Sequence, residues 1–281
     1  MNNVNSTNGK ATTETPIVGM QCYQQPFVSL YNEDCRETMK RIPDGSIDLL
    51  LQDTPFGCTQ NEWDIKPIFA EMWPEWERIT KDNGAMIFFG TQPFASELIL
   101  SRSAFFKYDL IWEKSIATGF LNANKQPLRA HESILVFYRK QCTYNPIKIN
   151  LGTPSFKKTW RAGSESKHGG NYGKFNNTNT GSKDGSRFPR SVFYIKADNE
   201  SFNSSKQGLT IHPTQKPLDL IRYLILTYTN KGETVFDGYS GSGTTAAACL
   251  NEGREFIGSE LNEEYFKKSV KRLEAIHPQL F

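Results

Sequence analysis

The sequence predicts an α/β fold, in which a mostly parallel sheet carries helices on both faces and a basic region is inserted. Short apolar runs alternate with helical patterns over most of the chain, and such alternation is typical of a parallel sheet. Several runs lack polar alternation, as expected of strands that helices cover on both faces. The predicted strands are SIDLLLQ (46–52), GAMIFFG (84–90), YDLIWEK (108–114), SILVFYR (133–139), SVFYIK (191–196), TVFDGY (234–239) and EFIGSEL (255–261).

Two helices near the end of the chain have clear signals. In KPLDLIRYLILTYT (216–229), apolar side chains recur at helical spacing and Pro217 suits a first-turn position. Asn262 is a good N-cap for the last helix, and Glu263 and Glu264 follow it in the first turn. A small-residue helix is expected to begin near Thr244.

Length and composition describe a globular protein with a real core. The chain has 281 residues, of which 37% are hydrophobic, and roughly 150 residues per domain suggests one or two domains. Its five cysteines are scattered and form no CxxC pair, so neither a zinc site nor a disulfide framework is supported. The polar start lacks a signal peptide, and no run approaches the roughly 20 apolar residues of a membrane span. We expect a cytoplasmic protein.

Two segments depart from the α/β pattern. Residues 1–25 are polar and are expected to form a flexible tail. Residues 139–206 contain 13 basic and four acidic residues, although the whole chain carries a net charge of only +3. An isolated charge run is usually a solvated loop, but an excess this large, with aromatic residues interleaved, favours contact with a polyanion. The interleaved aromatic residues are Trp160, Tyr172 and Phe175.

The predicted strand at 46–52 runs into an unusual turn. Its apolar run stops at Asp53, which is followed by Thr54, Pro55, Phe56 and Gly57. Asp, Pro and Gly are common turn formers, so a structural explanation exists. The same arrangement also leaves a carboxylate and an aromatic ring at the end of a buried strand.

A second landmark, FDGYSGSGTT (236–245), is a glycine-rich turn between a strand and a helix. Its glycines permit close approach of a ligand, and the helix N-terminus offers free N–H groups. Another strand is expected to end at Glu260, 23 residues beyond Asp237, where an acidic side chain can accept both hydroxyls of a ribose. The turn is therefore a candidate nucleotide site.

Three ligands suit such a turn to different degrees. A phosphate-binding Walker loop requires a lysine directly after its last glycine. Gly243 is followed by Thr244 instead, so a Walker loop is excluded. A nicotinamide fingerprint requires G-x-G-x-x-G, and Ala246 can stand at its last position, so an oxidoreductase remains an alternative. S-adenosylmethionine fits the same strand–turn–helix–strand layout. The glycine turn alone leaves the choice open.

The two landmarks together resemble one family. DTPF (53–56) resembles the D-P-P-Y catalytic motif of DNA amino-methyltransferases, and FDGYSGSGTT resembles their S-adenosylmethionine motif. HPTQKPLDLIRYLI (212–225) is similar to the motif that precedes the cofactor loop in the β-class of these enzymes. LYNEDCRETMKRIPDGSIDLLLQD and LRAHESILVFY (128–138) also look like that class, as does the order of the motifs. The resemblance covers roughly residues 28 to 275.

The resemblance implies a Rossmann-like methyltransferase sheet in three parts. A catalytic half (26–139) and a cofactor-binding half (207–281) would flank a DNA target-recognition region (140–206). Asp34 and Cys35 would lie near the adenine ring of S-adenosylmethionine, Glu260 would hold the ribose, and Thr214 and Lys216 would lie near the methionine carboxylate. Caps, surface acids or solvated charges are the structural alternatives for these residues. The remaining implied cofactor contacts are Asp53, Asp237, Tyr239, Ser240, Gly241, Ser242, Gly243 and Thr244.

The implied chemistry is methyl transfer to a base amine, which is a poor nucleophile because its lone pair is delocalised. Asp53 and the Thr54 carbonyl would accept the two N–H groups, Pro55 would stiffen the turn, and Phe56 would stack on the flipped base. Thr54 and Phe56 replace the usual proline and tyrosine, and reduced activity is expected from each. In the cofactor motif Gly238 replaces proline and is expected to loosen the turn. Neither His131 nor His212 has a second metal ligand at a useful spacing, and no metal is expected.

The sequence thus predicts a site-specific DNA methyltransferase that acts on N6 of adenine, since Asp rather than Ser at position 53 favours adenine in this family. The alternatives are an N4-cytosine methyltransferase and a non-catalytic nucleic-acid-binding subunit. A homodimer is expected, and a companion restriction endonuclease is a candidate partner. The residues predicted to contact DNA are Lys157, Lys158, Arg161, Lys167, Lys174, Arg187 and Arg190.

Overall fold

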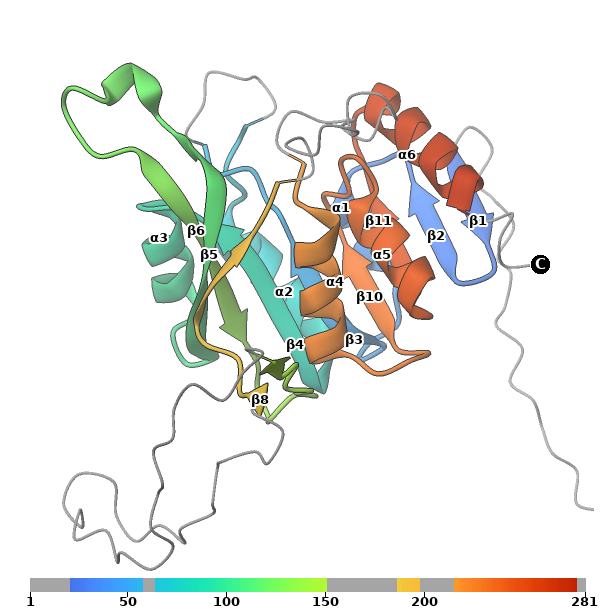
Figure 1. The fold of residues 1–281 in the computed structure, drawn as a ribbon. Coiled ribbons are helices and arrows are strands. Elements are labelled where there is room, and N and C mark those ends of the chain that lie inside the picture. Colours follow the sequence, from blue (N-terminus) through green and yellow to red (C-terminus); the bar gives the residue numbers. More distant parts are fainter. Residues whose placement is uncertain (1–20, 58–63, 151–185, 198–214, 277–281) are drawn as a thin grey trace, which may run out of the picture.

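A nine-stranded mixed sheet forms the centre of the molecule (Figure 1). The computed structural model describes residues 21–57, 64–150, 186–197 and 215–276, with only the backbone described at 149–150. The strand order is β1-β2-β11-β10-β3-β4-β6-β5-β9. The strands of this sheet are β1 (Cys22–Gln25), β2 (Val28–Tyr31), β3 (Ile47–Gln52), β4 (Thr80–Gly90), β5 (Phe106–Thr118), β6 (Arg129–Phe137), β9 (Val192–Ile195), β10 (Thr234–Asp237) and β11 (Glu255–Ser259).

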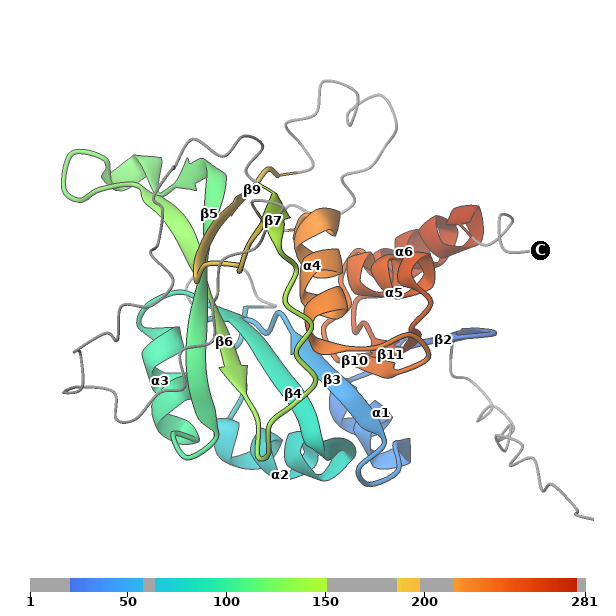
Figure 2. The same ribbon diagram turned by 60° about the horizontal axis from the view of Figure 1, so that its bottom comes forward.

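Three helices cover each face of the sheet, and Figures 1 and 2 show the two layers. Apolar side chains of α1 (Cys35–Arg41), α2 (Phe69–Ile79) and α3 (Phe94–Ser101) form the core on one face. Those of α4 (Leu218–Tyr228), α5 (Thr244–Glu252) and α6 (Glu263–Ile276) form the core on the other face. The predicted two-sided architecture is confirmed.

The central strand β3 contains a continuous apolar run at residues 49–51, and burial on both faces of the sheet explains it. Ile47 and Leu50 belong to the core under α1 to α3, whereas Leu49 and Leu51 belong to the opposite core. Successive side chains of a strand point to opposite faces, so burial of both faces favours apolar residues at consecutive positions, here 49–51. Since β2, β11, β10, β3 and β4 run parallel, their carboxyl ends meet at one edge of the sheet. The two landmark turns follow β3 and β10 at this carboxyl edge.

All seven predicted strands are present, with shifted ends. β10 ends at Asp237 and β11 at Ser259, so Glu260 lies just beyond its strand. β5 and β6 extend further than predicted and form a long hairpin, with the 3-10 turn η1 (Phe120–Asn122) in its connection. Asn262 caps α6 as predicted, because its Oδ1 accepts hydrogen bonds from the N–H groups of Glu264 and Tyr265.

The structure differs from the predicted boundaries at two places. Residues 22–25, expected in the flexible tail, form β1, which pairs with β2 at the edge of the sheet. Within the predicted recognition region, β9 pairs with β5 and so belongs to the main sheet, while β7 (Ile149–Asn150) and β8 (Ser186–Arg187) form a separate pair. The first difference arises from a tight hairpin between β1 and β2, and the second from strand pairing across long sequence separations. Among the described helices, none has the length and apolar character needed to cross a membrane.

Candidate active site

Gln52 joins the two sequence landmarks at the carboxyl edge. It is the last residue of β3 and its side chain is fully buried. Its Nε2 donates to the Phe236 carbonyl (3.1 Å), and its Oε1 accepts from the Gly238 N–H (3.2 Å). A buried amide needs such partners because an unpaired polar group inside a protein is costly. The turn after Asp53 is thereby fixed beside the glycine turn.

Asp53 is the first member of a chain of four alternating charges. Lys216 lies just before α4, and its Nζ is 2.7 Å from each carboxylate oxygen of Asp53. It also lies 3.0 Å from Oε1 of Glu132, whose Oε2 is 2.6 Å from Nζ of Lys114. The Glu132 side chain is only 4% exposed, whereas that of Asp53 is 30% exposed. Asp53 therefore forms the open end of an otherwise buried network.

The network fixes the protonation of its members. Burial alone would lower the pKa of the Lys216 ammonium, but Asp53 and Glu132 outweigh burial and raise it. Burial raises the pKa of Asp53, and Lys216 opposes that effect. Burial would also raise the pKa of Glu132, but Lys216 and Lys114 reverse the direction and lower it. Lys216 is thus a permanent cation beside a carboxylate that is sensitive to its surroundings.

Phe56 and Thr54 complete the turn after Asp53. The Phe56 ring packs against Phe94 with a centroid distance of 4.9 Å, and Lys216 Nζ lies 6.0 Å from its centroid. Thr54 is buried, and its Oγ1 has no hydrogen-bond partner within the described residues. Gly57 has a positive φ of 66° and donates its N–H to Asp64 (2.8 Å), which closes the turn. Such a φ is readily adopted by glycine.

Gly238 tightens the cofactor-type turn, contrary to the expected loosening. A Cβ at this position would lie 2.8 Å from Cys35 Cβ and 3.1 Å from Gln52 Oε1. The backbone can approach α1 this closely only because glycine has no side chain. Its N–H also donates to Gln52, which a proline could not do. The replacement of proline by glycine is therefore a packing requirement of this chain.

Asp34 and Cys35 lie where α1 meets the glycine turn. Asp34 caps α1 by accepting from the Arg36 N–H (2.8 Å), and its ion pair with Arg36 lowers its pKa. Burial raises the pKa of the Cys35 thiol to about 11. Cys35 lies at the glycine turn because it contacts Gly238. Asp34 caps α1, which is the structural alternative to its predicted contact with the cofactor.

The glycine turn is held from inside by two carboxyl groups. Asp237 accepts from Thr245 Oγ1 (2.6 Å) and from the Tyr239 N–H (2.9 Å), and burial raises its pKa to about 7. Glu260 accepts from the N–H groups of Gly241 and Asn262, each at 2.8 Å, and burial raises its pKa. Both carboxyls therefore shape the backbone of the turn.

The turn has the features of a nucleoside-binding cradle. At Gly243, where φ is 70°, a Cβ would lie 3.0 Å from Ser269 Cβ. Ser240 Oγ is buried and has no hydrogen-bond partner within the described ranges. Ser242 Oγ and Thr244 Oγ1 are 3.0 Å apart. Buried donors and acceptors with a carboxylate at the next strand suit the hydroxyls and amines of S-adenosylmethionine.

Other predicted residues do not join this edge. Arg190 lines a cavity of about 300 Å³ with Tyr108 and Tyr138, beside the amino ends of β5 and β9. Arg187 lies in β8, at the same side of the molecule. The remaining predicted DNA-contacting residues and the predicted cofactor contact lie outside the described residues: Lys157, Lys158, Arg161, Lys167, Lys174 and Thr214.

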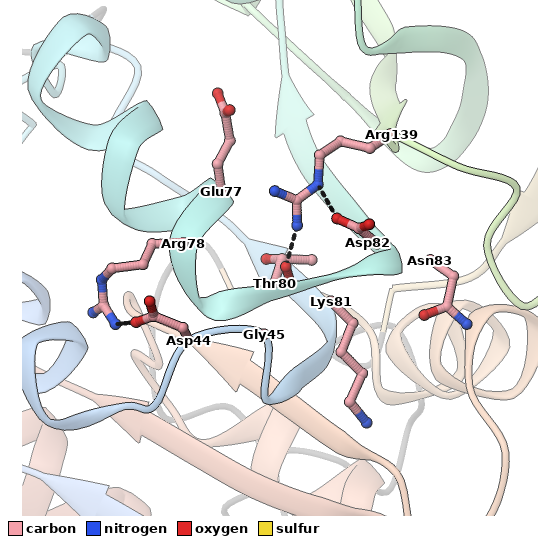
Figure 3. A pocket seen from close by; sticks show the side chains of 9 residues that line it. All are labelled: Asp44, Gly45, Glu77, Arg78, Thr80, Lys81, Asp82, Asn83 and Arg139. Carbon is pink, nitrogen blue, oxygen red and sulfur yellow. Dashed lines mark hydrogen bonds and ion pairs between the residues drawn. The ribbon is translucent and has the colours of Figure 1, made fainter.

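A larger polar pocket lies at the amino edge, away from Asp53 (Figure 3). Its volume is about 490 Å³, and Thr80, at the start of β4, belongs to its lining. Two ion pairs join residues of its lining, Arg78 with Asp44 (2.6 Å) and Arg139 with Asp82 (3.5 Å). Such pairs tie adjacent loops together and explain the pocket as a structural feature.

Sequence reasoning missed Gln52, Glu132 and Lys114. The available signal was an ionisable or amide side chain at the end of an apolar strand: Gln52 closes LLLQ, Lys114 closes DLIWEK, and Glu132 precedes SILVF. Polar residues at such positions are rarely buried without a partner. Their partners come from distant parts of the chain and are not readable from spacing.

Comparisons with known proteins agree with the family that the two landmarks resemble. A family described as DNA methylase (N6_N4_Mtase) matches residues 47–271. The type II methyltransferase M1.MboII of Moraxella bovis is 26% identical, with 85% of this chain and 94% of the relative covered. The DNA adenine methyltransferase YhdJ of Escherichia coli (strain K12) is 27% identical, with 88% and 82% covered.

Solved structures share the fold. The crystal structure of the M1.HpyAVI–SAM complex has a TM-score of 0.57 at 24% identity and covers 87% of this chain and 99% of that one. PvuII DNA methyltransferase (cytosine-N4-specific) has a TM-score of 0.58 at 16% identity, with 90% and 92% covered. Because the family match spans most of the chain and includes both landmarks, this protein belongs to the DNA methylase family of S-adenosylmethionine-dependent DNA amino-methyltransferases.

Proposed function

We propose that this DNA methyltransferase acts on N6 of adenine within a specific sequence, after the base has been flipped out of the helix. The observation that carries the proposal is the Asp53 carboxylate at the end of β3, joined through Gln52 to the glycine turn. An aspartate at this position, rather than serine, favours adenine in the resembled class. An adenine methyltransferase is also among the curated relatives.

Asp53 and Thr54 would grip the amine of the flipped base. Each carboxylate oxygen has more than one lone pair, so Asp53 can accept a base N–H while it keeps its contact with Lys216. The Thr54 carbonyl would accept the second N–H, which directs the nitrogen lone pair toward the methyl group that S-adenosylmethionine supplies. Phe56, already packed on Phe94, would stack on the base, and Pro55 would keep the turn rigid.

The glycine turn would hold the cofactor. Glu260 retains acceptor capacity beyond its two backbone contacts and would take the ribose hydroxyls. Lys216 would attract the methionine carboxylate, and Cys35 and Asp34 would border the adenine ring. The predicted contacts of Thr214 remain part of this proposal. The other residues lining the turn would be Asp237, Tyr239, Ser240, Gly241, Ser242, Gly243 and Thr244.

The basic region would track DNA phosphates and choose the sequence. Phosphate contacts release counterions, so affinity for DNA should fall steeply with salt. Replacing Lys157, Lys158 and Arg161 together by glutamine should reduce the slope of log affinity against log salt by about three. An unchanged slope would contradict the assignment. A homodimer and a companion restriction endonuclease remain predictions of the family resemblance, and sedimentation velocity would test the former.

The function is tested by identifying the methylated nucleoside. Unmethylated genomic DNA is incubated with the protein and S-adenosylmethionine, digested, and analysed by mass spectrometry, with Asp53→Asn alongside. Asp219→Asn is the matched control, because that side chain is exposed on α4. N6-methyldeoxyadenosine from the wild type and the control, but not from Asp53→Asn, is the expected result.

Two other results would change the proposal. N4-methyldeoxycytidine would support methyltransferase activity but contradict adenine as the target base. No methylated nucleoside, from a folded protein that binds both DNA and S-adenosylmethionine, would favour a non-catalytic binding subunit.

A further inference from the structure

The β5–β6 hairpin continues past the body of the sheet as an arm, defined here as residues 115–131. Its strands pair as far as Glu113 opposite His131 and again at Thr118 opposite Arg129, with an irregularity between the two, and η1 lies in the connection. Figures 1 and 2 both show the arm projecting from the molecule. Since β6 is antiparallel to β4 and to β5, the arm extends from the carboxyl edge, where Asp53 lies.

The root of the arm is part of the candidate active site. Glu132, the next residue after the arm, contacts Lys216, which in turn contacts Asp53. Ser115 Oγ accepts from the Ala197 N–H (3.0 Å), which holds the other strand of the root against the segment after β9. These contacts anchor the root of the arm beside the candidate active site, and the tip projects from it.

The tip exposes apolar side chains that nothing in the described chain covers. Every residue from 118 to 131 is exposed, with Phe120 at 75% and Leu121 at 85%. Large apolar groups gathered on a projecting element are a sign of an interaction site. A partner for these side chains would therefore come from outside the described part of the molecule.

The charge of the arm identifies the kind of partner. The arm has no acidic residue, but it has Lys125 and Arg129. The tip also carries the amides of Asn122, Asn124 and Gln126, which suit the edges of bases. An element with cationic and amide side chains and an apolar tip is suited to bind DNA. DNA-binding proteins insert Phe or Leu between base steps, and their Lys and Arg side chains pair with phosphates.

We propose that the arm enters the DNA beside the target nucleotide, and that Phe120 and Leu121 fill the space in the base stack when the target base turns toward Asp53. This inference rests on the proposed function, since a wedge is needed only if a base leaves the duplex. Lys125 and Arg129 would hold the arm against the phosphates on either side. The side chains of the tip thus act on the DNA, and no part of the methyl-transfer chemistry is assigned to them.

The test compares the wild type with Phe120→Ala/Leu121→Ala on two synthetic duplexes. Both carry the site mapped by sequencing DNA that the wild type has methylated. In one duplex the target base is paired, and in the other it faces an abasic position. Leu100→Ala is the matched control, because this leucine is 77% exposed on α3, outside the site and the arm.

The double variant should lose about tenfold or more in kcat/KM on the paired duplex, and should stay within about threefold of the wild type on the abasic duplex, because a base without a partner is cheaper to flip. Leu100→Ala should match the wild type on both. Thermal unfolding and S-adenosylmethionine affinity should be unchanged in the double variant. In a separate measurement, Lys125→Gln should reduce the slope of log affinity against log salt by about one.

Three results would overturn the wedge. Equal losses on both duplexes would assign the tip a role outside base flipping, and undiminished activity would assign it none. A changed sedimentation coefficient with the duplex preference intact would make the arm a contact between copies of this chain. Failure of the proposed function is a distinct result, in which the wild type methylates no genomic DNA, no site can be mapped, and the wedge proposal falls with it.

Discussion

Lys216 places its ammonium nitrogen 2.7 Å from each carboxylate oxygen of Asp53, although 163 residues separate the two along the chain. The pair joins the segment before α4 to the turn after β3, and so connects the cofactor half of the sequence with its catalytic half. Glu132 holds Lys216 from the opposite side at 3.0 Å. The position of one lysine therefore depends on two carboxylates, and each can be tested separately.

Lys216→Met should move the acid limb of the pH–rate profile to higher pH. Burial raises the pKa of Asp53 and Lys216 opposes it, so loss of the ammonium leaves burial unopposed and raises this pKa further. Asp53 must be ionised to accept the base amine, and a shift of one pKa unit would reduce kcat/KM about tenfold on the acid side. Lys81→Met is the control, because Lys81 pairs with Asp48 (2.6 Å) at the opposite edge. A pH profile that is lowered but not shifted would contradict the coupling.

Glu132→Gln should destabilise the fold more than removal of an exposed carboxylate. The Glu132 side chain pairs with Lys114 and Lys216 while almost completely buried, and breaking a buried pair costs about 3–5 kcal/mol. Glu97→Gln is the comparison, since its exposed pair with Lys66 should contribute about 0–1 kcal/mol. Equilibrium unfolding in urea measures both. Equal losses would mean that the buried network does not stabilise the protein.

Gln52→Leu should weaken S-adenosylmethionine binding without a direct contact to the cofactor. The substitution leaves the Phe236 carbonyl and the Gly238 N–H without their partner, which costs about 1–3 kcal/mol of stability and releases the glycine turn. Calorimetry should show reduced affinity, and denaturant unfolding should show the loss of stability. Gln24→Leu, at an exposed position of β1, should change neither. Unaltered affinity in Gln52→Leu would show that the turn is positioned without this amide.

Asp237→Asn should flatten the pH dependence of stability between about pH 4 and 7. In the folded protein burial raises the pKa of Asp237 to about 7, whereas the ordinary value is 3.8. In this window the folded state holds a proton that the unfolded chain has lost, so the free energy of unfolding falls as pH rises. An uncharged asparagine removes that contribution. Urea unfolding at several pH values measures the slope, with exposed Asp219→Asn as the control, and parallel slopes for Asp237→Asn and the wild type would refute the shift.

Some elements of the fold were harder to predict than others, for physical reasons. β3 and residues 84–90 of β4 could be predicted because strands buried on both faces contain continuous apolar runs. β1 and β2 were not, since they are short, lie at the sheet edge and include polar residues such as Gln24 and Ser29. The extension of β5 and β6 into the arm was also missed, because residues 115–131 bury little and their pairing depends on the neighbouring strand.

The sequence by itself determined the α/β class, the order of the two landmarks, and Asp53, Asp237 and Glu260 as the residues at the ends of strands. Hydrophobic periodicity and turn chemistry are local, and local properties can be read along the chain. The tertiary structure decided that Gln52 bonds to Gly238, that Gly238 must lack a side chain beside Cys35, and that Lys216 lies between Asp53 and Glu132. Hydrogen bonds, ion pairs and steric contacts depend on distances in space, and only the pairing of β3 with β10 and β4 brings these residues within reach.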